Sequence, residues 1–287
     1  MTDTTEFFDM DAAPMRIGKV RLKVRDLDAV SGYYQSVMGL EEIARDARKV
    51  TLGKGETTLL VLEADPALAP GDRRQAGLFH TAFLMPTRAD LARWAGHIAE
   101  TGMRIEGASD HIVSEAFYLS DPEGNGIEVY ADRPVAQWLD AKGDIQMTTE
   151  RLDVQDLLAA GEGTRWTGFP EKGSIGHVHL QVGGTAAADR FYRDVLGFDV
   201  TVDYPGASFY GSGGYHHQLA GNIWNSRGAG QRPQGMAGLD AVEIVVRDVA
   251  DIATIAARAE SAGIEATNDG EGVTLRDPWG IAITLRN

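Results

Sequence analysis

The sequence contains no cysteine among its 287 residues. That absence excludes disulfide bonds, thiolate metal ligands and cysteine nucleophiles together, so any metal site must use histidine and carboxylate ligands. The chain also lacks an apolar run long enough to cross a bilayer, which argues against an integral membrane protein. Its first residues, MTDTTEFFDMD, are acidic and unlike a signal peptide. We therefore expect a cytoplasmic protein.

Basic residues are scarce as well. The 27 lysines and arginines face 42 aspartates and glutamates, which gives a formal net charge of −15. This balance argues against nucleic acid or an anionic membrane as a partner. With 43% hydrophobic and 24% charged residues, the composition is typical of a globular protein, and the length suggests two domains. Whether copies of the chain associate into a homo-oligomer stays open.

What the chain does contain is an internal repeat. The segment IGKVRLKVRDLDAVSGYYQSVMGLEEI, from Ile17, aligns without a gap with IGHVHLQVGGTAAADRFYRDVLGFDV, from Ile175. Each segment begins with the alternating apolar residues of a strand and continues into an amphipathic helix that ends at Gly39 or Gly197. In the first segment, Asp26 or Asp28 is expected to cap the helix. A repeat on this scale determines how the whole fold is interpreted.

A second, weaker pair of repeats begins at Phe79 and at Leu239. Each predicts a strand, a helix, a DP-x-G turn and a closing strand that holds Glu128 or Thr284. The sequence therefore predicts an α+β fold of four βαβββ units that form two half-barrel domains. The units are expected at 15–64, 78–132, 174–226 and 237–287. The predicted divisions are a flexible N-terminal tail 1–14, a first pair of units 15–132, an interdomain connection 133–173 with a short helix from Val154 to Ala160, and a second pair 174–287.

The most specific stretch is DHIVSEAFYLSDPEGNGIEVY, which runs from Asp110 to Tyr130. It contains His111, a Phe117-Tyr118 pair, an acidic-Pro-x-Gly turn and Glu128 in the returning strand. This order resembles the signature of the extradiol ring-cleavage dioxygenases, the catechol 2,3-dioxygenase-like enzymes of the vicinal-oxygen-chelate superfamily. Ser109 departs from the residue that the family usually has two places before the histidine.

The resemblance implies a mononuclear metal site on the opening and closing strands of the units. The opening strands offer Lys19, His80, His177 and Asp240, and the closing strands offer Glu128 and Thr284. Of these, His80, His177 and Glu128 are competent, and two imidazoles with one carboxylate form the facial arrangement of non-haem Fe(II) oxygenases. Mn(II) accepts the same ligands. The implied reaction is cleavage of a catecholic ring beside its hydroxyl groups, with dioxygen as co-substrate and a small aromatic diol as substrate.

The resemblance also assigns catalytic roles. His111 is the candidate proton donor and acceptor, since an ordinary imidazole titrates near neutral pH, and Tyr118 is the candidate hydrogen-bond donor to a bound catecholate. His179 shares a strand face with His177 and is expected to line the same cavity. His216 and Gln218 are expected to face the cavity from a further strand, with His217 pointing away. Trp224, Asn225 and Arg227 follow in a glycine-rich segment that would form the cavity mouth.

Several alternatives stay open. For the three ligands to meet, units two and three must share a cavity, as in glyoxalase I relatives, or units must pair across a dimer. If units pair sequentially, the first cavity holds only His80 and Glu128. A glyoxalase I-like lyase or isomerase, or a metal-free ligand-sequestering protein like the bleomycin-resistance proteins, would use the same fold. Neither the diol nor the choice between iron and manganese can be deduced from the sequence.

Overall fold

The computed structural model describes residues 6–270 and 272–287, which form the four predicted βαβββ units. The first unit comprises β1 (Met15–Val24), α1 (Leu27–Met38), β2 (Glu41–Arg45), β3 (Lys49–Lys54) and β4 (Thr57–Ala64). The second comprises β5 (Gly77–Leu84), α2 (Arg88–Thr101), β6 (Gly107–Asp110), β7 (Ser114–Ser120) and β8 (Gly126–Asp132).

The other two units follow the same order. The third comprises β9 (Ser174–Gln181), α4 (Thr185–Asp189) continued by a π-helical turn (Arg190–Val195), β10 (Asp199–Tyr204), β11 (Ala207–Gly211) and β12 (Leu219–Asn222). The fourth comprises β13 (Gly238–Val246), α5 (Val249–Ser261), β14 (Thr267–Asn268), β15 (Val273–Arg276) and β16 (Ala282–Arg286).

Local sequence fixes where the helices begin and end. The Asp26 side chain accepts a hydrogen bond from the Ala29 amide at the start of α1, and Thr87 caps α2 in the same way. Both helices end at a glycine in the left-handed conformation, Gly39 at φ 68° and Gly102 at φ 69°. A side chain would be strained there, because a Cβ atom crowds the backbone at such angles.

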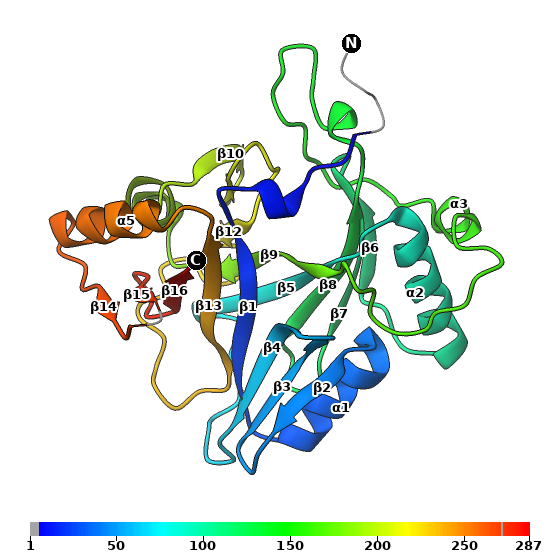
Figure 1. Ribbon diagram of the computed structural model, residues 1–287, viewed down its shortest axis with the longest axis horizontal. Coiled ribbons are helices and arrows are strands. Elements are labelled where there is room, and N and C mark those ends of the chain that lie inside the picture. The colour runs from blue at the N-terminus through cyan, green and yellow to red at the C-terminus, as the bar shows by residue number, and fades with distance from the viewer. Residues whose placement is uncertain (1–5, 271) are drawn as a thin grey trace.

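The units pair across the sequence rather than along it. One eight-stranded sheet has the order β14-β15-β16-β13-β1-β4-β3-β2, and the other has the order β10-β11-β12-β9-β5-β8-β7-β6. Units one and four therefore share one sheet, while units two and three share the other. The joining seams are antiparallel, β1 against β13 and β5 against β9. In Figure 1, β1 and β13 lie side by side although their blue and orange colours mark distant parts of the chain.

A single hydrophobic core joins the two curled sheets. Val20 and Leu22 of β1, with Val178 and Leu180 of β9, belong to one buried cluster, and β1 lies against β9. The helices lie on the outer sides of the sheets (Figure 1). None of the helices in the described part of the chain is both long and apolar enough to cross a membrane.

The segments outside the units are well packed. The connection 133–173 contains α3 (Val154–Ala159), which confirms the predicted short helix, and it buries Trp138 and Phe169 completely. Of the predicted tail 1–14, residues 1–5 lie outside the described residues. Residues 6–14 are not a loose tail, because the Phe8 ring packs 4.9 Å from that of Tyr215 and 6.2 Å from that of Trp138.

Candidate metal centre and cavity

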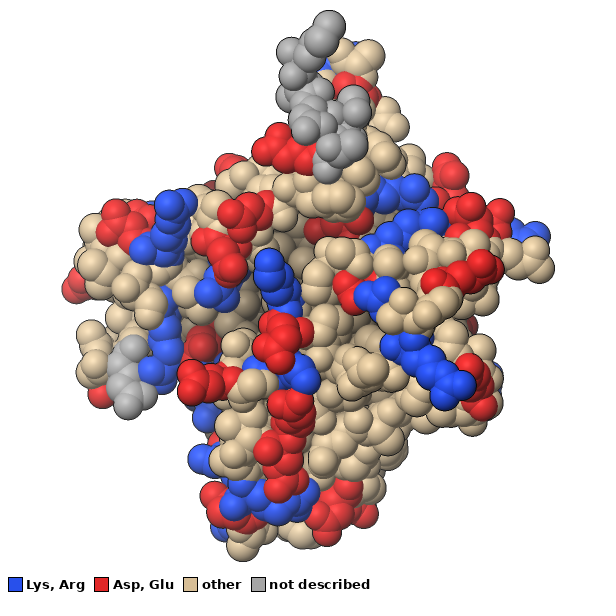
Figure 2. All heavy atoms as spheres, turned by 45° about the vertical axis from the view of Figure 1, so that its right-hand side comes forward, with Lys and Arg blue, Asp and Glu red and all other residues tan. Residues whose placement is uncertain are grey.

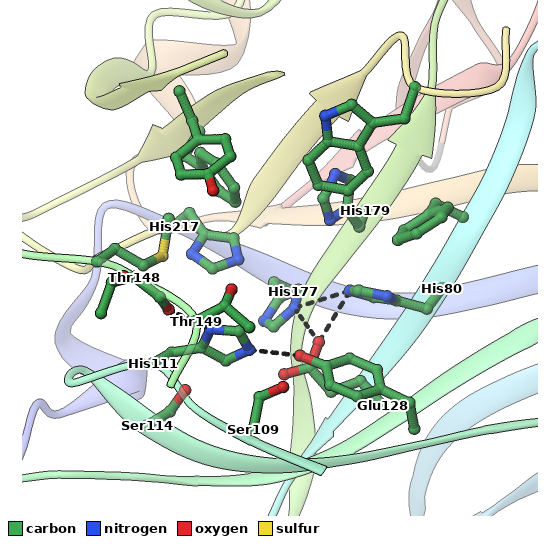
Figure 3. A pocket seen from close by; sticks show the side chains of 16 residues that line it. His80, Ser109, His111, Ser114, Glu128, Thr148, Thr149, His177, His179 and His217 are labelled. Carbon is green, nitrogen blue, oxygen red and sulfur yellow. Dashed lines mark hydrogen bonds and ion pairs between the residues drawn. The ribbon is translucent and has the colours of Figure 1, made fainter. Parts of the chain in front are cut away.

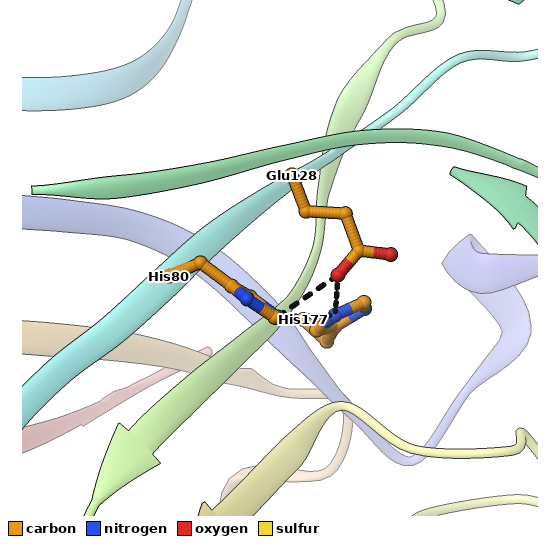
Figure 4. A group of neighbouring side chains, drawn as sticks. All are labelled: His80, Glu128 and His177. Carbon is orange, nitrogen blue, oxygen red and sulfur yellow. Dashed lines mark hydrogen bonds and ion pairs between the residues drawn. The ribbon is translucent and has the colours of Figure 1, made fainter. Parts of the chain in front are cut away.

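Three polar side chains meet on the inner face of the sheet made by units two and three. The sheet register pairs Ala82 of β5 with His177 of β9 on one side and with Glu128 of β8 on the other. His80 lies two residues before Ala82, so its side chain points to the same face. The alternation of side chains along three neighbouring strands is therefore enough to gather His80, Glu128 and His177 (Figure 4).

The ligand-bearing atoms of these residues form a small triangle. The Glu128 Oε2 atom lies 2.9 Å from His80 Nε2 and 3.2 Å from His177 Nε2, and the two imidazole nitrogens are 3.3 Å apart. Three atoms about 2.1 Å from one ion would lie about 3.0 Å apart at right angles and about 3.4 Å apart in a tetrahedron. The separations of 3.2 and 3.3 Å fall in this range, and the separation of 2.9 Å lies just below it. Two imidazole nitrogens beside a carboxylate oxygen are a donor set that suits a divalent transition metal.

Burial and neighbouring charges keep His177 and Glu128 in the protonation states that a metal requires. All three residues are at most 6% exposed. Burial lowers the pKa of His177 to about 4, so its imidazole is neutral at pH 7. Burial alone would raise the pKa of Glu128, but the adjacent His177 and His80 outweigh that effect and hold it well below its usual range. The site therefore presents an ionised carboxylate and a neutral His177 ring before any metal arrives.

His111 lies beside the triangle (Figure 3), and the Tyr118 ring lies 5.7 Å from that of His80, centroid to centroid. The His111 Nδ1 atom is 2.6 Å from the carbonyl oxygen of Thr148, and its Nε2 atom is 2.6 Å from the Tyr118 hydroxyl. A carbonyl oxygen can only accept, so Nδ1 carries the proton, and in the neutral ring Nε2 accepts from Tyr118. Burial and the neighbouring Glu128 carboxylate raise the pKa of Tyr118 well above its usual value, which keeps the hydroxyl protonated.

A further histidine lines the cavity, and it is His217 rather than His216. The ring centroid of His217 lies 4.2 Å from that of His177. His216 points the other way and places Nε2 2.8 Å from Asp132 Oδ1. The prediction that His216 faces the cavity is therefore wrong. The prediction assumed that residues 212–218 form a strand, in which side chains alternate between two faces. These residues form a bend before β12 instead, so the alternation does not apply.

Gln218 is also turned away from the cavity. Its side-chain oxygen accepts a hydrogen bond from the Ser212 amide, and its amide nitrogen donates to the Ser212 carbonyl. The residue is fully buried, and both of its polar atoms are engaged by the backbone of its own turn. The prediction that Gln218 faces the cavity is wrong for the same reason as for His216. Gln218 does not offer a fourth protein ligand.

The cavity encloses about 280 Å³, close to the lower end of the range for small-molecule sites. His179 lies in its wall, where its Nε2 atom is 3.0 Å from the amide nitrogen of Asn222. Burial lowers the pKa of His179 and of His217 well below the usual value, so both rings are neutral. The wall also contains a group of hydroxyl-bearing and apolar residues: Ser109, Ser114, Met147, Thr148, Thr149, Tyr204, Phe209, Phe79 and Trp224.

The corresponding face of the other sheet contains different residues. By the sheet register, Lys19 takes the place of His177, Ala241 that of His80 and Thr284 that of Glu128. The sequence comparison placed Asp240 at the position of His80, one residue too early, whereas the register makes Asp240 the counterpart of Phe79, the bulged residue of β5. Lys19 pairs with Glu243 at 2.8 Å, and on the face in Figure 2 acidic and basic side chains intermingle.

The chain belongs to the Glyoxalase/Bleomycin resistance protein/Dioxygenase superfamily, which it matches over residues 16–129 and 174–285. Catechol-2,3-dioxygenase of Bacillus subtilis (strain 168) is 39% identical over 267 residues, which cover 91% of this chain and 93% of that protein. Biphenyl-2,3-diol 1,2-dioxygenase 2 of Rhodococcus globerulus is 26% identical over 125 residues, 43% of this chain and 65% of that one. The predicted resemblance to extradiol dioxygenases and the predicted fold class are confirmed.

Solved structures share the fold at low sequence identity. Glyoxalase I from Zea mays superposes with a TM-score of 0.57 and 18% identity, covering 96% of this chain and 93% of that one. The cppA protein from Streptococcus pneumoniae TIGR4 gives a TM-score of 0.56 at 13% identity, covering 94% and 98%. These likenesses extend over all four units.

Sequence reasoning missed two parts of the site. It turned His217 away from the cavity, and it treated 133–173 as a surface connection, whereas Met147, Thr148 and Thr149 of that segment line the cavity. Of the predicted mouth residues, Trp224 lines the cavity, while Asn225 and Arg227 are not among its lining residues. Both segments lie outside regular helices and strands, so neither has a periodic sequence pattern from which the direction of its side chains could be predicted.

Proposed function

We propose that this protein is an extradiol dioxygenase. It would insert both atoms of dioxygen into a catechol and break the ring bond between one hydroxyl-bearing carbon and the neighbouring carbon that bears no hydroxyl group. His80, His177 and Glu128 would hold a single Fe(II) or Mn(II) ion. The observation that carries the proposal is the triangle of 2.9, 3.2 and 3.3 Å formed by their ligand atoms, with the Tyr118–His111 pair beside it. When bound, the metal supplies a common centre for the diol and dioxygen and favours ionisation of a coordinated hydroxyl.

The residues beside the triangle would orient the diol and handle its protons. When the diol binds, Tyr118 would turn its hydroxyl hydrogen from His111 Nε2 to one oxygen of the diol. His111, held by the Thr148 carbonyl, would then have Nε2 free to accept and return the proton needed at the reacting face. His217, whose ring lies 4.2 Å from that of His177, would accept the proton of the second hydroxyl. The mostly apolar wall would keep bulk water away from the reacting atoms.

The structure weighs against a glyoxalase I-like activity. The sequence left that alternative open and placed Gln218 among the cavity-facing residues. The Gln218 side chain is hydrogen-bonded to the backbone of Ser212, so His80, His177 and Glu128 are the candidate protein ligands. A metal held by three protein ligands keeps coordination positions open for the diol and for dioxygen. The alternative of a metal-free binding protein predicts no gain in stability when metal is added.

The proposal is tested on protein purified without oxygen and loaded with Fe(II), and in parallel with Mn(II). Catechol is then added in air, and oxygen uptake and the yellow ring-cleavage product are recorded together. We expect one dioxygen consumed for each diol cleaved. A protein that retains about one metal per chain and consumes no oxygen with any catechol would refute the proposal, and metal-dependent isomerisation of a hemithioacetal would replace it with the glyoxalase-like activity.

A further inference from the structure

Among the described residues, 6–270 and 272–287, Ile112 is the only non-glycine residue with a positive φ, which is 68°. The left-handed region is small for every L residue, and a β-branched residue is an outlier there because its side chain crowds the backbone. Such strained residues cluster at functional sites. Ile112 directly follows His111, so the strained position lies in the turn that carries the candidate proton donor and acceptor.

Backbone and side-chain hydrogen bonds hold this turn, between β6 and β7, on both sides of His111. The Asp110 amide donates to the Glu150 carbonyl at 3.1 Å, and the Glu150 amide donates to the Asp110 carbonyl at 2.8 Å. The Ile112 amide donates to Asp110 Oδ1 at 2.9 Å, and the His111 amide donates to the Ser114 carbonyl at 2.8 Å. A strained φ persists only where the surrounding structure fixes the backbone in this way.

The fourth unit contains the same turn with a glycine at the corresponding position. Between β14 and β15, the Gly270 amide donates to Asn268 Oδ1 at 2.8 Å, and the Asp269 amide donates to the Gly272 carbonyl at 3.3 Å. Gly270 has a φ of 86°, which a glycine adopts without strain. These hydrogen bonds repeat those of the β6–β7 turn. The shape of the turn therefore requires a residue at positive φ but does not require the isoleucine of the second unit.

Packing does not account for the isoleucine either. Ile112 is half-buried, and none of the hydrophobic clusters in the described part of the chain includes it. What a β-branched residue supplies is stiffness, because its permitted range of backbone angles at positive φ is narrow, whereas glycine has a wide range. The neighbouring His111 ring makes two contacts that depend on its direction, each of 2.6 Å, with the Thr148 carbonyl and the Tyr118 hydroxyl (Figure 3).

We propose that Ile112 is a positioning residue, which keeps the His111 ring directed at these two partners by restricting the backbone beside it. The inference rests on the proposed function for the role of His111 in turnover, whereas the restriction of the backbone exists with or without metal. Misplacing a catalytic group by about 1 Å can lower a rate about 10²-fold, so a stiff turn beside a proton-transfer group has a direct effect on kcat.

The direct test is made on metal-free protein that is isotope-labelled at the ring nitrogens of its seven histidines. The Nδ1 proton of His111, protected by its hydrogen bond to the Thr148 carbonyl, should give a resolved resonance that His111→Ala removes. We expect Ile112→Gly to speed exchange of this proton with water about tenfold or to broaden its resonance beyond detection. Ile112→Val keeps the β-branch and should leave the resonance unchanged.

Steady-state kinetics on the Fe(II)-loaded protein provide the second measurement. Ile112→Gly should lower kcat for catechol about tenfold, with little change in KM or in metal content. Ile112→Val should retain the native kcat. In a chain that already carries His111→Ala, adding Ile112→Gly should have no further effect on kcat, since both changes act through one side chain.

Stability distinguishes positioning from packing. Ile112→Gly relieves the strained backbone, so the midpoint of urea unfolding should not fall. Gly270→Ile is the matched control, because it places the same residue in the corresponding turn of the fourth unit. Beyond the chain neighbours of Gly270, no described atom lies within 4 Å of an added Cβ, so strain is the main effect. This variant should lower the urea midpoint and leave kcat unchanged.

The outcomes distinguish the inference from the function on which it rests. If Ile112→Gly leaves either the His111 resonance or the kcat of an active enzyme at its native value, the inference is overturned and the dioxygenase proposal stands. A lower urea midpoint with an unchanged resonance would show that Ile112 only stabilises the fold, which also overturns the inference. If the native protein binds metal but cleaves no diol, the function itself has failed, and the ring resonance alone decides whether Ile112 positions His111.

Discussion

The Nδ1 atoms of His216 and His217 lie 2.9 Å apart, and the outer nitrogen of His216 lies 2.8 Å from Asp132 Oδ1. A carboxylate can only accept a hydrogen bond, so His216 carries a proton on Nε2, and in its neutral form it accepts through Nδ1. His217 must then donate through Nδ1, which leaves its Nε2 as an acceptor toward the cavity. Asp132 thus sets the tautomer of a histidine that it does not contact.

Replacing Asp132 by asparagine should lower kcat with little change in metal content. An asparagine amide can donate to His216, which reverses the direction of donation and places a proton on the cavity nitrogen of His217. We expect kcat to fall about tenfold or more. His217→Ala should cause a similar loss. Adding Asp132→Asn to His217→Ala should have little further effect, because the two residues act through one chain of hydrogen bonds.

The matched control for that series is Asp144→Asn, which removes an exposed carboxylate from the connection that follows β8. Steady-state kinetics at measured metal occupancy give kcat and KM separately. Independent, additive losses from Asp132→Asn and His217→Ala would show that Asp132 does not act through His217.

Removing one candidate ligand should abolish metal binding. We expect His80→Ala and Glu128→Ala to retain less than a tenth of the native metal content by elemental analysis after dialysis. Loading the native chain with metal should raise its unfolding temperature, since a ligand at 100 times its dissociation constant stabilises by about 2.7 kcal/mol. The two variants should not respond. His97→Ala, a histidine on α2 outside the cavity, is the control, and native behaviour of His80→Ala would refute the assigned triangle.

His111 should be dispensable for metal binding but required for turnover. His111→Ala leaves the three ligand atoms in place and removes the partner of the Tyr118 hydroxyl, so we expect full metal content with kcat lower by about 10²–10⁴-fold. Tyr118→Phe keeps the ring and removes the hydroxyl, and it should raise KM for the diol as well as lower kcat. Loss of metal from His111→Ala would instead make His111 a ligand.

Asp277 should make stability depend on pH. It lies in the turn before β16, where it accepts a hydrogen bond from Tyr192 at 2.9 Å, and burial raises its pKa to about 6. The folded state therefore holds this proton more tightly than the unfolded state. Its stabilising contribution is full below about pH 4 and is lost as pH rises to about 6, by roughly 3 kcal/mol.

Asp277→Asn removes this ionisation while keeping an oxygen that can accept from the backbone. The free energy of unfolding of the variant minus that of the native chain should therefore increase between pH 4 and pH 6, as measured by urea unfolding at a series of pH values. Tyr192→Phe removes a donor that lowers the pKa of Asp277, so it should shift the transition to higher pH. A difference that does not vary with pH would contradict the assignment.

The sequence predicted those parts of the site that depend on regular alternation. His80, His177 and Glu128 lie on strands whose side chains follow a period of two, so repeat comparison could place them on one face, although their role as ligands stays a proposal. The bend at 212–218 has no such period, and the direction of His216 was therefore predicted wrongly. Asp240 was misplaced by one residue because the weak second repeat was aligned with Leu239 opposite Phe79, whereas the sheet register makes Asp240 the counterpart of Phe79.

The pairing of the units was not determined by sequence either. The ligand positions required units two and three to meet, but pairing within one chain and pairing across a dimer satisfied that requirement equally. The sheet order resolves the choice within one chain. Thr148 positions His111 through its backbone carbonyl. Every residue has such a carbonyl, so the sequence gives no sign of this contact.

Crossed pairing also constrains how this chain can reach its native state. The seam between β1 and β13 joins Met15 to Val246, so the first strand made by the ribosome waits for nearly the whole chain before it finds its neighbour. Contacts of such long sequence separation slow folding and prolong the exposure of unpaired strand edges. A chain cut within 133–173 would yield two fragments that each hold half of both sheets. Neither fragment would work alone, but the two could restore a complete cavity by associating.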